Sequence, residues 1–191
     1  MKVVLLSGAV VGAKTRNIVD ILQGVINRQF PEVESTLLDL AAYDVEFSDG
    51  RVYWDYGFAS DTRYVASTVL GADGLIIVAP VYQASIPAPL KNVFDLLPLH
   101  ALRDTVAGIA MIAASARHFM VPEYQLKPIL SYLRAPIVPH YVFMEEKDFD
   151  EDNHLINAEV GLRLARLVED TIRLADLHRR QREAPAAPTS D

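Results

Sequence analysis

Short runs of Val, Ile and Leu recur along the chain, and in the first three of them no polar residues alternate with the apolar ones. The runs are Val3–Leu6, Leu75–Ala79, Val106–Ala114 and Ile137–Met144, with a weaker fifth run at Glu34–Leu40. Continuous apolar runs of this length are typical of strands that are covered on both faces, as in a parallel sheet. We therefore expect five strands, with the first three of the strong runs fully buried.

The segments between these runs carry apolar residues at helical spacing. In the first of them Ile18, Leu22 and Val25 share one face, and Pro31 follows as a stop. This spacing predicts helices at Thr15–Gln29, Asp61–Leu70, Pro89–Leu97, Val121–Leu133 and Asn157–Arg179. Strands that alternate with helices in this way predict an α/β, doubly wound fold, in which a five-stranded parallel sheet carries helices on both faces.

The chain has 191 residues, which suits a single domain at 1–180. The tail at 181–191 contains Pro and Ala without an apolar pattern, so we expect it to be disordered. Every apolar run falls well short of the ~20 residues that a bilayer requires, so we expect no membrane segment. The absence of Cys excludes disulfides and thiol chemistry and is compatible with a cytoplasmic location.

The net charge of −7 argues against a general nucleic-acid binder. Much of the acidic excess gathers at 145–152, which we expect to lie away from any anion site. The five His residues are scattered without ligand spacing, so no metal site is expected.

In a doubly wound sheet, ligands bind at the carboxyl ends of the strands, so the loops after Leu6, Ala79 and Ala114 are the candidate site. The first of these loops leads into a helix, whose N-terminal N–H groups attract phosphate. The charges and hydrogen-bond donors that the loop offers are Ser7, Lys14, Thr15, Arg16 and Asn17. The alternative is that Thr15 only caps the helix and that the basic side chains are solvated.

Two named phosphate motifs are not met in the first loop. A Walker A loop requires glycine directly before its lysine, and Ala13 stands before Lys14. The dinucleotide fingerprint Gly-x-Gly-x-x-Gly is also absent, because position 10 is Val and position 13 is Ala. These departures argue against a nucleotide triphosphatase and against a Rossmann dehydrogenase.

The second loop is stiff, because Pro80, Pro87 and Pro89 fall within ten residues. Rigid backbone groups can bind the edge of a flat heterocycle, with Tyr82 as an apolar cover. Lys91 lies beyond the loop in the predicted helix, where we expect it to pair with Asp95 one turn later.

The stretch Pro80-Val81-Tyr82-Gln83-Ala84-Ser85, followed by Pro87-x-x-Leu90-Lys91-Asn92-x-x-Asp95-Leu96-Leu97-Pro98, resembles the signature of NAD(P)H-dependent FMN reductases. Tyr124–Pro128 and Pro139–Phe143 resemble later parts of the same family, and the resemblance extends from Lys2 to Arg179. It implies a flavodoxin-like three-layer sandwich with FMN bound across the three loops. Reduced nicotinamide, NADPH or NADH, would pass a hydride to the flavin.

The resemblance places the phosphate of FMN in the first loop and the isoalloxazine ring against the second and third. Together with the loop chemistry it assigns cofactor binding to Ser7, Lys14, Thr15, Arg16, Asn17, Pro80, Val81, Tyr82, Ser85, Ala114, Ser115 and His118. The first loop lacks the Gly-Ser-x-Arg of many members, and we expect Lys14 and Arg16 to replace that charge. His118 is assigned to the nicotinamide nucleotide, with a solvated or capping histidine as the alternative. No catalytic side chain is expected, because hydride transfer is the chemistry of the flavin itself.

Pro128 falls inside the predicted 121–133 helix and cannot donate to the carbonyl of Tyr124. The freed carbonyl favours a kink or a π-bulge. In the alkanesulfonate-linked branch of the family, a tyrosine in a similar context lies in such a bulge at a tetramer interface. The resemblance therefore suggests Tyr124 at the interface of a homodimer or homotetramer, with ordinary kinked-helix packing as the alternative.

The resemblance implies an NAD(P)H:FMN oxidoreductase that supplies reduced FMN to a partner monooxygenase. Two alternatives stay open, namely a reductase of quinones or azo compounds that keeps FMN bound, and a flavodoxin-type electron carrier. The long connection 41–60 is either functional or a surface loop that packs its own aromatic side chains. Those side chains are Tyr43, Phe47, Tyr53, Trp54, Tyr56 and Phe58.

Overall fold

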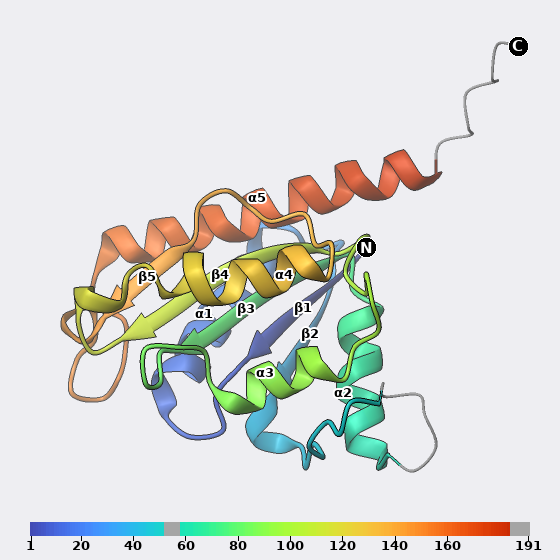
Figure 1. The fold of residues 1–191 in the computed structure, drawn as a ribbon. Helices are drawn as coiled ribbons and strands as arrows, with labels where there is room; N and C mark the ends of the chain where they lie inside the picture. Colours follow the sequence, from blue (N-terminus) through green and yellow to red (C-terminus); the bar gives the residue numbers. More distant parts are fainter. Residues whose placement is uncertain (52–57, 184–191) are drawn as a thin grey trace, which may run out of the picture.

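The computed structural model describes residues 1–51 and 58–183, which form a parallel sheet between two layers of helices (Figure 1). The strand order is β2-β1-β3-β4-β5, and every neighbouring pair is parallel. The strands are β1 (Lys2–Ser7), β2 (Glu34–Asp39), β3 (Gly74–Pro80), β4 (Val106–Ala113) and β5 (Val142–Glu145). The predicted five-stranded α/β architecture is therefore confirmed.

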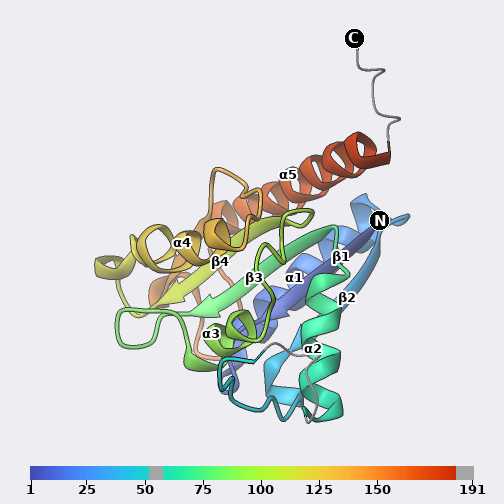
Figure 2. The same ribbon diagram turned by 45° about the vertical axis from the view of Figure 1, so that its right-hand side comes forward.

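The helices divide between the two faces of the sheet, as Figures 1 and 2 show from two directions. The long helices α1 (Ala13–Gln29) and α5 (Ala158–Glu183) cover one face. The other face carries α2 (Ser60–Leu70), α3 (Ala88–Asp95) and α4 (Lys127–Tyr132). Successive strand residues feed these two cores alternately, because side chains along a strand point to opposite faces.

The central strands β1, β3 and β4 are buried along almost their whole length, as their unbroken apolar runs predict. The last predicted strand is wrong in its first half, because Ile137 makes only an isolated bridge to Ala107 and regular pairing begins at Val142. Pro139 lies in between and has no N–H group with which to continue a ladder.

The third loop leads into a π-helical segment, Pro122–Leu126, and then into α4. The π-bulge predicted from Pro128 is confirmed: the segment includes Tyr124, the residue whose carbonyl a proline at 128 leaves without a donor. The side chain of Tyr124 is 69% exposed.

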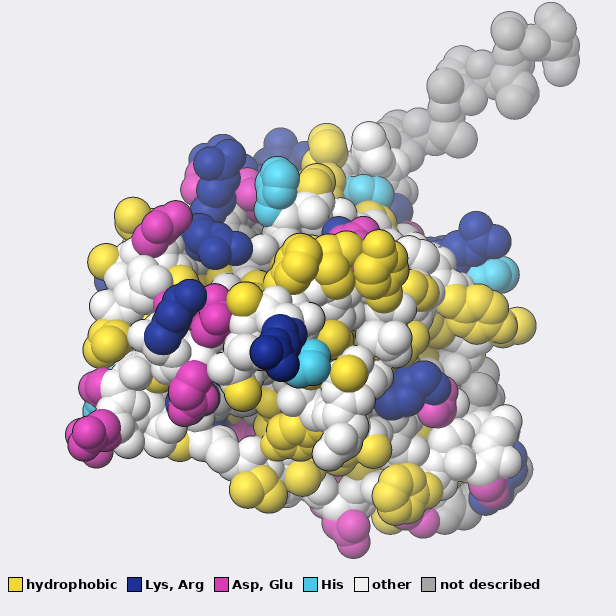
Figure 3. Space-filling view, turned by 60° about the vertical axis from the view of Figure 1, so that its left-hand side comes forward, with side chains coloured by type: hydrophobic (Ala, Val, Ile, Leu, Met, Phe, Trp, Pro, Cys, Tyr) yellow, Lys and Arg dark blue, Asp and Glu magenta, His cyan; other side chains and the backbone are white. Residues whose placement is uncertain are grey.

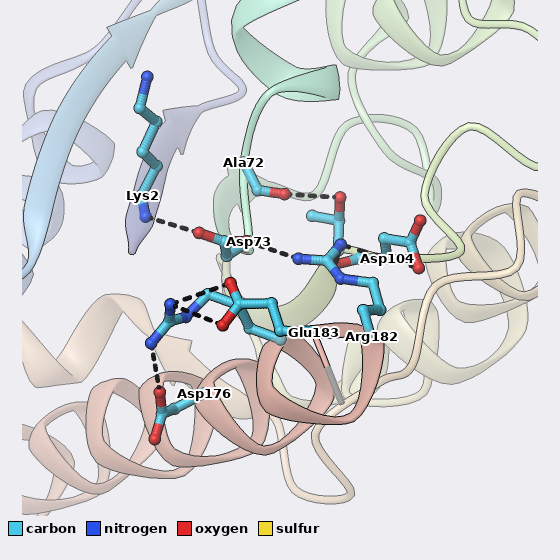
Figure 4. Close-up of polar contacts among 9 residues, drawn as sticks. Lys2, Ala72, Asp73, Asp104, Asp176, Arg182 and Glu183 are labelled. Atoms are coloured by element: carbon cyan, nitrogen blue, oxygen red, sulfur yellow. Dashed lines mark hydrogen bonds and ion pairs between the residues drawn. The ribbon is translucent and has the colours of Figure 1, made fainter. Parts of the chain in front are cut away.

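A polar network connects α5 to the segments at the amino ends of the strands (Figure 4). A carboxylate oxygen of Asp73 accepts the backbone N–H of Lys2 at 2.8 Å, and the other accepts from Arg182 at 3.0 Å. Arg182 also reaches the backbone carbonyl of Asp104, at 3.4 Å. We call Lys2, Asp73, Asp104 and Arg182 the amino-end network.

The amino-end network explains why α5 runs to Glu183, beyond the domain boundary expected at 180. Residues 181–183 are helical rather than disordered, because Arg182 is tied to the turns that precede β3 and β4. The rest of the expected tail, 184–191, lies outside the described residues, as do Tyr53, Trp54 and Tyr56 of the aromatic connection.

The described part of the aromatic connection is held to the domain by a buried amide. Asn92 of α3 donates to the carbonyl of Glu46 at 2.9 Å and accepts from the backbone N–H of Ser48 at 2.8 Å. The aromatic rings divide, since Phe58 is buried and Phe47 is exposed. Across residues 1–51 and 58–183, no helix combines the length and the apolarity needed to cross a membrane.

Candidate functional site

The candidate site lies where the strand order reverses, between β1 and β3. The chain leaves β1 toward α1 on one face and leaves β3 toward α3 on the other, so the two loops part and leave a crevice. Gly8 follows β1 directly, and its N–H donates to the carbonyl of Val78 in β3 at 2.8 Å. A Cβ there would lie 3.0 Å from the end of the Leu90 side chain and 3.1 Å from the Cβ of Ala79, so glycine avoids a tight contact with both.

A cavity of about 300 Å³ occupies this crevice. Figure 3 is turned so that this side of the molecule comes forward, and it shows hydrophobic side chains interspersed with both basic and acidic ones. The cavity is lined by Val11, Gly12, Ala13, Lys14, Thr15, Pro80, Val81, Tyr82, Ile112, Ala113, Ala114, Glu146 and Asn153. The structure thus brings all three predicted loops together and adds a fourth loop, the one that follows β5.

One end of the cavity is the N-terminus of α1. The helix begins at Ala13 after Gly12, whose φ of 106° is a conformation that favours glycine. Among the described residues no side chain caps this helix, so its first N–H groups are left for another acceptor. Thr15 is buried within the first turn, so the alternative in which Thr15 caps the helix is wrong.

Lys14 lies in this first turn and is held from two sides. Its ammonium forms an ion pair with Glu146 and lies 5.5 Å from the centre of the Phe149 ring. Glu146 begins the short 3₁₀ segment Glu146–Asp148 directly after β5. The expectation that the acidic stretch 145–152 lies away from the anion site is therefore wrong for Glu146.

Arg16 and Asn17 are outside the cavity lining. The Arg16 guanidinium forms ion pairs with Asp20 at 3.1 Å and Asp39 at 3.3 Å. Burial alone would lower the pKa of Arg16, but the hydrogen bonds and charges of these two carboxylates raise it above its ordinary value. Asn17 donates to the backbone carbonyl of Asn153 at 2.9 Å, so it positions the fourth loop.

The second loop, which also lines the cavity, closes into a tight turn. Tyr82 and Ser85 exchange two backbone hydrogen bonds of 3.0 and 2.9 Å, and Gln83 and Ala84 between them have positive φ. The Tyr82 hydroxyl donates to the carbonyl of Val11 at 3.4 Å, which links the second loop to the first. The Ser85 hydroxyl donates to the side chain of Gln125, so it faces the π-helical segment rather than the cavity.

The remaining predicted residues differ in position. Pro80, Val81 and Ala114 line the cavity, whereas Ser7 is buried at the end of β1. Ser115 and His118 lie beyond the lining, and His118 ends a short 3₁₀ segment, Ala116–His118. Their assignments to the cofactor and the nicotinamide stay predictions.

Sequence reasoning missed Glu146 and Asn153, although a signal for both was present. The apolar run before residue 145 predicts a strand, and the carboxyl ends of parallel strands meet at one edge of the sheet. The loop after this strand therefore belongs with the other three, but its acidic composition argued against an anion site.

The donor set suits a flat heterocycle that carries a phosphate on a flexible chain. The α1 N-terminus, Lys14 and Thr15 offer N–H groups, a positive charge and a hydroxyl for the phosphate. Pro80, Val81, Ala113 and Ala114 offer a wall without charge for a ring. FMN has both parts, so the residues present fit this cofactor.

Comparison with known proteins agrees with this chemistry. The family model of NADPH-dependent FMN reductases matches residues 1–150. The chain is 40% identical, over 91% of its length, to an NAD(P)H-dependent FAD/FMN reductase of Geobacillus thermodenitrificans, 93% of which is covered.

Two solved structures share the fold. The apo form of the NADH:FMN oxidoreductase EmoB has a TM-score of 0.71 at 19% identity, with 98% of this chain and 92% of that chain covered. Oxidised flavodoxin 1 of Bacillus cereus has a TM-score of 0.62 at 15% identity, with 91% of this chain and 98% of that chain covered. These likenesses show that the fold is flavodoxin-like.

Proposed function

The chain belongs to the NADPH-dependent FMN reductase family, and on that premise we propose that FMN binds in the cavity at the carboxyl ends of the strands. The protein is an oxidoreductase that uses FMN and reduced nicotinamide. In the proposal the phosphate binds at the N-terminus of α1 and the ring lies along 80–82 and 113–114.

One observation carries this placement: the uncapped start of α1 opens into the same cavity as Lys14 and the apolar wall of the second and third loops. Bound FMN supplies the hydride-accepting chemistry. The residues of the chain bind FMN and orient it. Lys14 and Thr15 hold the phosphate, and Tyr82 covers the ring and braces the first loop through its bond to Val11.

We extend the proposal to the partners of the enzyme. His118 contacts the nicotinamide nucleotide, and reduced FMN passes to a partner monooxygenase in the cytoplasm. The chain assembles as a homodimer or homotetramer with Tyr124 in an interface. The exposure of Tyr124 on a π-helical segment supports this last point, because a large side chain in that position has its ring free for a neighbour.

The experiment is to purify the protein, record whether flavin is bound, and follow the oxidation of NADH and NADPH with and without added FMN. We expect oxidation that depends on FMN. Turnover that needs added FMN identifies flavin as a substrate, whereas turnover of a quinone by protein with tightly bound flavin favours the quinone-reductase alternative. No oxidation of either nucleotide under any of these conditions would exclude the reductase function.

A further inference from the structure

The positive charges around the phosphate end of the cavity are already paired within the protein. Lys14 contacts Glu146, and Arg16 contacts Asp20 and Asp39. Of these acids, Glu146 lines the cavity. A phosphate that approaches Lys14 therefore competes with a carboxylate, which is also negatively charged, for the same ammonium.

The two partners of this ion pair differ in their freedom to move. The Lys14 side chain is 20% exposed and lies over the ring of Phe149, whereas the Glu146 side chain is 65% exposed. Because the Glu146 carboxylate is mostly exposed, water can solvate it when the ion pair breaks, which lowers the cost of its release. Glu146 can turn toward solvent while Lys14 stays in place.

The turn that carries Glu146 does not depend on its carboxylate. Asp148 is buried and accepts the backbone N–H of Glu145 at 2.8 Å and the side-chain amide of Asn157 at 2.7 Å. Glu146 contributes its backbone carbonyl, which accepts the N–H of Phe149 at 3.2 Å. The Glu146 side chain is therefore available for a role in ligand binding.

We propose that Glu146 sets the affinity for FMN: its carboxylate holds Lys14 in the free protein and is displaced by the phosphate of the incoming flavin. This inference rests on the proposed function, which places FMN in this cavity. Each binding event exchanges one anion for another on Lys14, so the net gain is small. The exchange therefore limits how tightly the protein can hold FMN.

The test compares FMN with riboflavin, which has the same ring but no phosphate. Dissociation constants for both flavins are measured for the wild type, Glu146→Gln and Glu146→Ala, with Glu151→Gln as the matched control. Glu151 is an exposed acid of the same loop, and its replacement makes the same change in net charge. A thermal unfolding curve for each variant verifies that it is folded.

In both Glu146 variants we expect the Kd for FMN to fall by about tenfold, because removal of a nearby like charge favours the phosphate. The Kd for riboflavin should stay within about twofold, and Glu151→Gln should behave as the wild type. FMN binding to Glu146→Gln should also weaken more steeply with salt, since an unpaired Lys14 forms a new ion pair on binding.

Three results would overturn the inference while leaving the proposed function intact. They are an unchanged FMN affinity in both Glu146 variants, an equal gain for FMN and riboflavin, or the same gain in Glu151→Gln. Failure of the proposed function looks different, because the wild-type protein then binds neither flavin.

Discussion

The two ends of the sheet use the same kinds of polar contact in different ways. At the amino end, Asp73 accepts the backbone N–H of Lys2 as well as the guanidinium of Arg182. At the carboxyl end, Lys14 and Glu146 join two loops through their side chains alone, beside a cavity.

This difference distinguishes contacts that stabilise the fold from a contact that a ligand can replace. The Asp73 side chain is only 19% exposed, and its two oxygens accept from a backbone N–H and from a guanidinium, so its loss removes two charge-assisted hydrogen bonds at once. The Lys14–Glu146 contact can be replaced by another anion, because its acidic partner is mostly exposed. Changes at the amino end should therefore affect stability, and changes at the carboxyl end should affect binding.

The largest effect is expected for Asp73→Ala. Loss of the acceptor for Lys2 and Arg182 should lower the free energy of unfolding by about 2 kcal/mol, since hydrogen bonds to charged groups contribute about that much. The Kd for FMN should not change. Urea unfolding measures the free energy of unfolding, and flavin titration measures the Kd for FMN.

The control is Asp104→Ala, because the Asp104 side chain is more exposed than that of Asp73. This change should lower the free energy of unfolding by less than about 0.5 kcal/mol. A large change in FMN affinity for Asp73→Ala would show that the two ends are not independent.

Lys14→Gln should have the opposite profile. We expect the Kd for FMN to rise about tenfold, because the phosphate loses its cation and meets a Glu146 carboxylate that no longer has a positive partner, while riboflavin binding and the urea midpoint change little. Lys147→Gln removes an equal charge from an exposed position in the fourth loop, next to Glu146, and serves as the control. Equal losses for FMN and riboflavin would contradict the placement of the phosphate beside Lys14.

Arg16→Ala compares the contributions of the two basic residues of α1, Arg16 and Lys14, to FMN affinity. Its guanidinium is already bound by Asp20 and Asp39 and lies outside the cavity lining, so we expect FMN affinity to fall by less than about threefold. Flavin titration at low salt gives the value. A loss as large as that of Lys14→Gln would mean that Arg16 leaves both carboxylates to hold the phosphate.

The smallest effect concerns stability at acid pH, where each end of the sheet has one partly exposed carboxyl group with a lowered pKa. The backbone N–H of His154 lowers the pKa of Asp150, and a hydrogen bond from Arg179 lowers the pKa of Asp176. Each group therefore stabilises the folded state above its unfolded pKa, and this contribution disappears as the pH falls through the folded pKa. In Asp150→Asn and Asp176→Asn, the urea midpoint should fall less between pH 7 and about pH 3 than in the wild type. A drop as steep as in the wild type would contradict the assignment.

Most of the fold can be predicted from the sequence, because buried parallel strands leave unbroken apolar runs such as those of β1, β3 and β4. The π-helical segment is also predictable, since Pro128 removes one particular hydrogen bond. The start of β5 is harder to predict. The apolar pattern begins at Ile137, but Pro139 has no N–H group for a ladder and regular pairing starts only at Val142.

The site divides in the same way. Lys14, Thr15 and Tyr82 follow from loop position and chemistry, whereas Pro80, Val81 and Ala114 follow from the family resemblance; all six line the cavity. The contact of Lys14 with Glu146 joins residues 132 positions apart, and the direction in which Arg16 points depends on Asp39 from the next strand. Such long-range contacts cannot be read from neighbouring residues in the sequence. The acidic composition of 145–152 therefore predicted that Glu146 lies away from the site, whereas it lines the cavity.

The most direct test is a crystal structure of the protein with FMN. We expect the phosphate to lie within hydrogen-bond distance of the first N–H groups of α1 and of the Lys14 ammonium, with the Glu146 carboxylate turned away. A phosphate bound elsewhere, or an intact Lys14–Glu146 contact beside bound FMN, would contradict it.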